Sequence, residues 1–198
     1  MKQHTLGWIN GFIGVAIFSG TLPATRVAVQ QLPPLFVTSA RACIAALLGG
    51  LLLCLLKQTR PHAAQLRSLI LVSMGVVLGF PLFTSLALQH ASSAHMIVFV
   101  GLLPLSTALF AVWRGGERPK PLFWAFALVG AISVASYALL NSDGAPWYSD
   151  VLMLAAIVVC GMSYAEGAKL SRELGGWQVI SWALLLSLPV ILPLALWS

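Results

Sequence analysis

The chain has 198 residues, of which 59% are hydrophobic and only 8% carry a charge, and its mean hydropathy is +0.93. Soluble globular domains contain about 25% charged residues, so this composition excludes a water-soluble protein and predicts an all-α polytopic membrane protein in a lipid bilayer. The net charge of +6 does not indicate a nucleic-acid partner. Lys and Arg occur in short clusters between apolar runs rather than along a stripe of their own, which membrane topology explains better.

Taken in chain order, the apolar residues form seven segments long enough to be membrane-spanning helices. The segments cover residues 6–29, 35–56, 66–88, 91–113, 122–140, 150–170 and 177–197. The connections between them are short. The clearest turn is NSDGAPW at 141–147, where Ser-Asp-Gly is followed by Pro, and it predicts a boundary between two units.

Basic residues alternate between successive connections, which predicts the orientation of the helices. They precede the first segment and follow the second, fourth and sixth segments: Lys2, Lys57, Arg60, Arg67, Arg114, Arg118, Lys120, Lys169 and Arg172. Cytoplasmic loops are enriched in Lys and Arg, so the pattern predicts a cytoplasmic N-terminus in the cell (inner) membrane.

Five prolines lie well inside four of the segments: Pro23, Pro81, Pro104, Pro189 and Pro193. Inside a bilayer, a proline is tolerated where neighbouring helices or water satisfy the backbone carbonyls that it frees. The prolines therefore predict a packed bundle around a cavity, and Pro104 predicts a kink beside that cavity.

Several of these features occur together in an order that resembles the EamA-type repeat of the drug/metabolite transporter superfamily. They are Leu103-Pro104-Leu105 in the fourth segment, then Gly116-Glu117-Arg118, then the apolar LVGA at 128–131. The sequence SGTLPATRVAVQQLPPLFVTSARACIAALL at 19–48 is similar to the start of the same repeat. The resemblance extends over nearly the whole chain.

This resemblance implies a bundle of ten helices built from two inverted five-helix repeats. The chain is then expected to contain one complete repeat at residues 1–140 and a truncated second repeat with two helices at 141–198. The implied function is ion-gradient-coupled transport of small organic metabolites such as amino acids or drugs by alternating access, with export as the expected direction. The alternative is a truncated, non-transporting protein that assembles with a full-length partner or regulates it; homo-oligomerisation is also open.

Three basic residues toward the predicted outer face are candidates for substrate binding or proton coupling: Arg26, Arg41 and His95. A charge inside a membrane is costly and is therefore a functional candidate. Together they predict a basic vestibule suited to carboxylate-bearing metabolites. Two alternatives stay open, since Arg41 can extend to the headgroups and His95 can be an interfacial histidine bonded in a loop. His95 can also carry a proton in an antiport cycle.

Two acidic residues toward the predicted cytoplasmic face complete the set of candidates. Glu166 is a candidate for proton coupling or substrate binding, although Lys169, three residues later, can pair with it on one helix face. Glu117 stands between Arg114 and Arg118 and is expected to belong to a salt-bridged loop that positions the fourth helix. The sequence contains no phosphate loop, zinc motif or catalytic dyad, so it predicts neither an enzyme nor a bound metal or cofactor.

Overall fold

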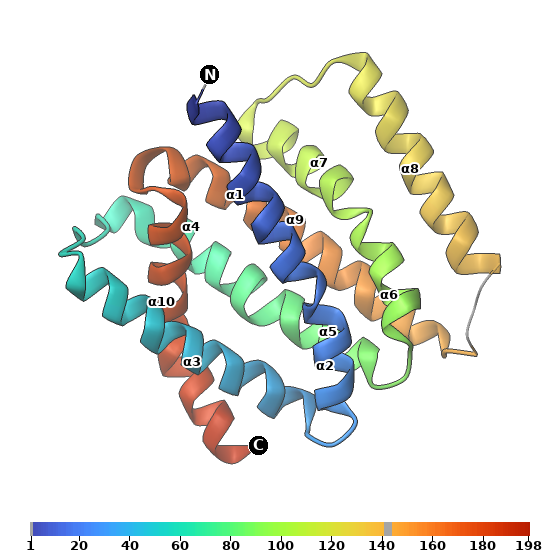
Figure 1. The fold of residues 1–198 in the computed structure, drawn as a ribbon, viewed down its shortest axis with the longest axis horizontal. Coiled ribbons are helices and arrows are strands. Elements are labelled where there is room, and N and C mark those ends of the chain that lie inside the picture. The colour runs from blue at the N-terminus through green and yellow to red at the C-terminus, as the bar shows by residue number, and fades with distance from the viewer. Residues whose placement is uncertain (1, 141–143) are drawn as a thin grey trace.

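The computed structural model of the protein describes residues 2–140 and 144–198, and every regular element in these residues is a helix. In chain order the helices are α1 (Lys2–Ser19), α2 (Thr21–Val29), α3 (Pro34–Leu55), α4 (Ala63–Val72), η1 (Ser73–Gly79), α5 (Phe80–Leu88), α6 (Ser93–Val100), α7 (Leu103–Gly115), α8 (Pro121–Leu140), α9 (Trp147–Leu174) and α10 (Gly176–Trp197). Figure 1 shows how they are arranged.

Seven stretches of the described residues are helical, long and apolar enough to cross a membrane. They are Gly7–Val29, Pro34–Leu55, Ala63–Leu88, Ser93–Arg114, Pro121–Ala138, Trp147–Leu174 and Gly176–Trp197. Each coincides with one predicted segment, so the prediction of an all-α polytopic membrane protein with seven spans is confirmed. The predicted boundary at 141–147 lies in part outside the described residues, because 141–143 are not among them. The division into a five-helix and a two-helix unit stays a prediction.

Three of the spans consist of more than one helix. The first changes from α1 to α2 at Gly20, and the fourth changes from α6 to α7 at Gly101 and Leu102. The third contains the π-helix η1 between α4 and α5. Pro104 lies in the first turn of α7, where the missing proline N–H removes no intrahelical bond. Pro81 is the second residue of α5, which follows η1 without a break, so its missing N–H leaves one carbonyl of η1 without a helical donor.

The interruption at Gly101 and Leu102 agrees with the kink predicted from Pro104. Pro189 and Pro193 behave differently, because both lie inside α10, which continues from Gly176 to Trp197. A proline in a membrane helix therefore does not always end the helix, as neighbouring groups can satisfy the freed carbonyls.

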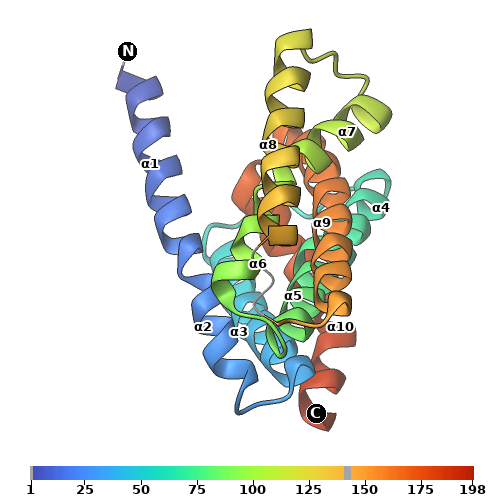
Figure 2. The same cartoon turned by 90° about the vertical axis from the view of Figure 1, so that its right-hand side faces the viewer.

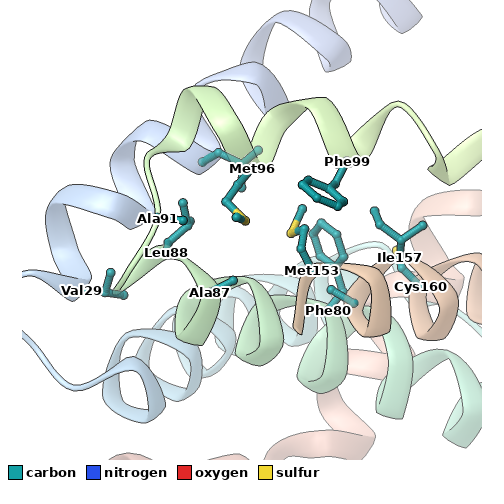
Figure 3. Close-up of a cluster of buried hydrophobic side chains, with 12 residues drawn as sticks. Val29, Phe80, Ala87, Leu88, Ala91, Met96, Phe99, Met153, Ile157 and Cys160 are labelled. Carbon is teal, nitrogen blue, oxygen red and sulfur yellow. The ribbon is translucent and has the colours of Figure 1, made fainter. Parts of the chain in front are cut away.

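Helix α9 lies at the centre of the packing. It contacts α4, η1, α5, α6, α7 and α10, while α3 packs along α10. Figure 3 shows side chains from α5, α6 and α9 that point into one shared core, among them Phe80, Phe99 and Met153. A second buried cluster joins α3, α4, η1, α9 and α10 around Leu69 and Ile191.

Small residues let the neighbours of α9 approach its backbone closely. A Cβ atom added to Gly75 in η1 would lie 1.7 Å from Ser163 Oγ of α9. A Cβ atom added to Gly161 of α9 would lie 2.2 Å from Ser106 Oγ of α7. Close backbone approach through small residues is typical of helix packing in membranes, where burial of apolar surface from water does not drive association.

Helices α1 and α8 lie at the margins of the bundle. Figure 2 shows α1 inclined away from the other helices toward its N-terminus. In the most apolar 18 residues of its span, α8 has no buried residue. The ordered core that positions the polar residues is therefore formed by α2–α7, α9 and α10.

Candidate functional site

The basic residues of the chain gather at one end of the bundle, which we call the basic end. It contains the connections from α3 to α4, from α7 to α8 and from α9 to α10, with Lys57, Arg60, Arg114, Arg118, Lys120, Lys169 and Arg172. Polar contacts join these connections, for example Gln65 Nε2 to Glu173 Oε2 at 2.8 Å and Gln178 Nε2 to Gln58 Oε1 at 3.2 Å. The other end, which contains the turns from α2 to α3 and from α5 to α6, is called the opposite end.

Glu166 of α9 is buried near the basic end, with 7% of its surface exposed. Ser68 Oγ of α4 donates a 2.6 Å hydrogen bond to its Oε1. Arg114 Nε of α7 lies 3.2 Å from Oε2 and forms an ion pair, although the geometry is not that of a directed hydrogen bond. The carboxylate therefore links three helices, and its charge is balanced inside the protein.

The partner of Glu166 differs from the one that helix spacing suggested. Lys169 does not pair with Glu166 but donates its Nζ hydrogen to the Arg114 carbonyl oxygen. Lys169 is exposed, whereas the Arg114 side chain reaches the buried carboxylate from the neighbouring helix. Spacing along one helix identifies near neighbours only, so it could not indicate a contact between α7 and α9.

His95 is buried in the first turn of α6 at the opposite end, with its side chain 1% exposed. Its backbone N–H donates a 3.1 Å hydrogen bond to Ser92 Oγ. Ser92 is therefore the N-cap of α6, which begins at Ser93. His95 Nε2 lies 2.9 Å from Asp150 Oδ1 of α9. An ionised carboxylate only accepts hydrogen bonds, so the ring donates. The alternative of an interfacial histidine in a loop does not describe this position.

The second ring nitrogen of His95, Nδ1, is buried and forms no hydrogen bond to any described residue. The ring edge meets Phe99 in a T-shaped contact with centroids 5.6 Å apart. Asp150, with its side chain 34% exposed, connects the buried ring to the surface.

Arg26 and Arg41 have different surroundings, although both were predicted to belong to one basic vestibule. Arg26 of α2 donates to the carbonyl oxygen of Leu88, the last residue of α5. Arg41 of α3 forms no hydrogen bond or ion pair with any residue that the structure describes. Of the three predicted vestibule residues, Arg26 and His95 therefore have a polar partner within the described residues, and Arg41 has none there.

Arg41 lines a hollow of about 520 Å³ between α1, α2 and α3. The other lining residues are mostly small or apolar: Ile17, Gly20, Thr21, Ala24, Thr25, Ala28 and Val37. Arg41 also lines a second, much smaller hollow of about 10 Å³, together with Phe80, Pro81 and Thr84 of α5. Thr21 and Thr25 line both hollows with Arg41.

Pro104 and Glu117 line a third hollow, of about 720 Å³, between α1, α7, α8 and α9. It is bordered by Val100, Leu103 and Thr107, so the break in the fourth span lies beside it. The Glu117 carboxylate also pairs with Arg172 Nη2 of α9 at 3.2 Å, with both side chains exposed. The predicted ion pair of the Glu117 loop is thus present, but it joins the loop to α9 rather than to Arg114 or Arg118.

Three residues that contact the candidates were missed by the sequence analysis: Ser68, Arg114 and Asp150. The only local signal for Asp150 is an acidic residue in the first turn of a helix, which has an ordinary explanation in the helix dipole. The contacts to Ser68, Arg114 and Asp150 cross 98, 52 and 55 residues of sequence. Such long-range contacts leave no periodic pattern in one sequence.

Comparison with known proteins indicates the family. The model of the EamA-like transporter family matches residues 5–139. A relative named "Uncharacterized transporter YdeK", from Bacillus subtilis (strain 168), is 61% identical over 195 residues, which are 98% of this chain and 68% of that protein. No solved structure matches the chain.

Proposed function

Because the chain belongs to the EamA-like transporter family, we propose that it exports small organic metabolites such as amino acids or drugs by alternating access, driven by an ion gradient. Its family is one of transporters and not of enzymes. The interrupted spans support the proposal, since broken helices in transporters border substrate and ion sites at membrane depth. Hollows at Arg41 and at Pro104 adjoin two of these interruptions.

The observation that carries the proposal of ion coupling is the contact of the buried His95 with the partly exposed Asp150, 2.9 Å apart. Histidine changes its charge near neutral pH, and proton relays in transporters use Asp, Glu and His side chains within the membrane. A proton bound by this pair would neutralise the Asp150 charge at the junction of α6 and α9. We therefore propose the proton as the coupling ion.

The arrangement of charges supports an orientation. The basic end carries the loop Lys and Arg residues, so we propose that it faces the cytoplasm of a cell whose inner membrane contains the protein. The N-terminus is then cytoplasmic, and the hollow at Arg41 and the His95–Asp150 pair lie toward the outside. Glu166, whose charge Arg114 balances, takes a structural role at the cytoplasmic end in this proposal.

We test transport by counterflow in proteoliposomes that contain the purified chain. The vesicles are loaded with one unlabelled amino acid or related metabolite at a time, and entry of the labelled compound is followed. Transport predicts a transient accumulation of label for at least one compound, which empty liposomes and boiled protein do not give. Absence of accumulation across the whole set would contradict the proposal.

A second candidate function is assembly with a full-length transporter without transport by this chain. It is favoured by α8, whose most apolar 18 residues are all unburied in this chain. Co-purification of an untagged full-length relative with the tagged chain, together with no counterflow by the chain alone, would support this candidate. Counterflow by the chain alone would exclude it.

A further inference from the structure

Arg41 is an exposed residue of α3, and it differs from two other arginines of the bundle in its partners. Arg26 is bonded to the Leu88 carbonyl oxygen and Arg114 is paired with Glu166. Within the described part of the chain, Arg41 has neither kind of partner. A charged group inside a membrane protein is normally paired with another charge or with backbone carbonyls, so its partner is to be sought outside the chain.

The position of Arg41 favours a ligand. It lies seven residues after Pro34, the first residue of α3, which is about 10 Å along the helix axis at 1.5 Å per residue. The residue lines the hollow of about 520 Å³ with Thr21 and Thr25 of α2. This volume lies within the range of about 300 to 1,000 Å³ that is typical of small-molecule sites. The polar side chains that line this hollow are those of Arg41, Thr21 and Thr25.

The wall of the hollow also limits the kind of anion. Apart from Arg41 and the two threonines, its lining is apolar or glycine: Ile17, Gly20, Ala24, Ala28 and Val37. One guanidinium can balance one negative charge and binds a carboxylate through two parallel hydrogen bonds. A phosphate dianion would keep an unbalanced charge in these apolar surroundings, which is costly.

We propose that Arg41, with Thr21 and Thr25, forms the subsite that binds the carboxylate of the transported metabolite, while the apolar wall of the hollow receives its uncharged part. This inference rests on the proposed transport function. It narrows the substrate class to small organic carboxylates, including zwitterions. It also separates Arg41 from Arg26 and His95, each of which has a hydrogen-bond partner within the chain.

Equilibrium binding tests the subsite without requiring transport. The purified chain in lipid nanodiscs is titrated with free carboxylates that carry small, aliphatic and aromatic groups, with their uncharged amides and with inorganic phosphate, and binding is followed by isothermal calorimetry. At least one carboxylate should bind, and its amide should bind about 10- to 100-fold more weakly, the range expected for loss of charge-assisted hydrogen bonds.

Variants then assign the binding to Arg41. Arg41→Gln should weaken carboxylate binding by about 10- to 100-fold, and Arg41→Lys should retain part of it because a point charge lacks the guanidinium fork. Arg118→Gln, which removes an exposed arginine from the loop after α7, is the matched control and should bind as the original chain does. Thermal unfolding without ligand verifies that each variant is folded.

Three results would overturn the subsite. They are no binding by any carboxylate of the set, unchanged binding in a folded Arg41→Gln variant, and tighter binding of phosphate than of every carboxylate. Unchanged binding would mean that Arg41 extends to the lipid headgroups. Carboxylate binding that depends on Arg41, with no counterflow of the same compound, would keep the subsite and reject the transport function.

Discussion

The two ends of α9 each hold an acidic residue against a basic partner from another helix, but the partners differ. Near the basic end, Glu166 pairs with Arg114, which stays charged at every physiological pH. At the opposite end, Asp150 Oδ1 lies 2.9 Å from Nε2 of His95, and a histidine, unlike an arginine, can be neutral or cationic. The two acids are 16 residues apart, or about 24 Å along the axis, which is somewhat less than the roughly 30 Å of hydrocarbon in a bilayer.

Helix α9 thus combines a contact with an arginine, called the fixed contact, and a contact with a histidine, called the variable contact. The carboxylate of Glu166 is additionally bonded to Ser68, so two polar contacts hold α4 and α7 to α9. The imidazole of His95 has an unpartnered Nδ1 within the described residues, so its contact with α9 depends on a single carboxylate. A proton-driven rearrangement would therefore begin at the junction of α6 and α9.

The largest effect on stability is expected from breaking the ion pair of Glu166 with Arg114. Arg114→Gln leaves the buried Glu166 charge without its counterion, which should lower the free energy of unfolding by about 3 kcal/mol, the lower part of the range for buried pairs because Arg114 is partly exposed. Unfolding in detergent, followed by circular dichroism, measures the change. The double variant with Glu166→Gln should recover much of the loss, while a single variant as stable as Arg118→Gln would contradict the assignment.

A smaller effect on stability is expected from disturbing the packing of η1 against the middle of α9. A Cβ atom on Gly75 would lie 1.7 Å from Ser163 Oγ and 2.8 Å from the Val159 carbonyl oxygen. Gly75→Ala should therefore lower the free energy of unfolding by about 2 kcal/mol, as is typical of overpacking. Gly130→Ala in α8, where a Cβ atom meets nothing within 4 Å, is the control in the same unfolding measurement. Equal stability of the two variants would show that η1 and α9 are not so closely packed.

The contact of His95 with Asp150 should contribute less to stability than the packing of Gly75. His95→Gln should lower the free energy of unfolding by about 1.5 kcal/mol, the lower value for a hydrogen bond to a charged group, because Asp150 is partly exposed and can be hydrated. Unfolding in detergent measures the effect, and a variant as stable as Arg118→Gln would remove the contact of His95 with Asp150 from the explanation.

The smallest effect is expected for the exposed pair of Glu117 and Arg172, with side chains 52% and 75% exposed. Glu117→Gln should change the free energy of unfolding by no more than about 0.5 kcal/mol, because water screens exposed pairs. The same unfolding measurement applies. A loss as large as that of Arg114→Gln would mean that the loop after α7, and not the buried Glu166, holds the basic end together.

The sequence predicted the spans because their signal is local. Each of the seven is a long apolar run, and Pro104 marks the interrupted fourth span, whose α7 starts at Leu103. The π-helix η1 was not predicted, since its residues are as apolar as an ordinary helix and its geometry depends on the contact of Gly75 with α9.

The sequence predicted individual residues of the candidate site, but it did not predict which residues pair with one another. The cost of charge in a membrane identified Arg41, His95 and Glu166 individually. The same rule could not indicate that Asp150 and Arg114 pair with two of them, because both contacts form only when α9 packs against α6 and α7. Nor could it separate Arg41 from Arg26, which is bonded to the carbonyl oxygen of Leu88 in the folded chain.

The central claim is that the contact of His95 with Asp150 couples transport to protons. Proton flux in proteoliposomes tests this claim most directly. A pH-sensitive dye is enclosed with the original chain or a variant, and a compound transported in counterflow is added outside. We predict that the compound moves protons with the original chain and with Glu117→Gln, while His95→Gln and Asp150→Asn abolish the proton movement. Proton movement that persists undiminished in both the His95 and the Asp150 variants would contradict the account.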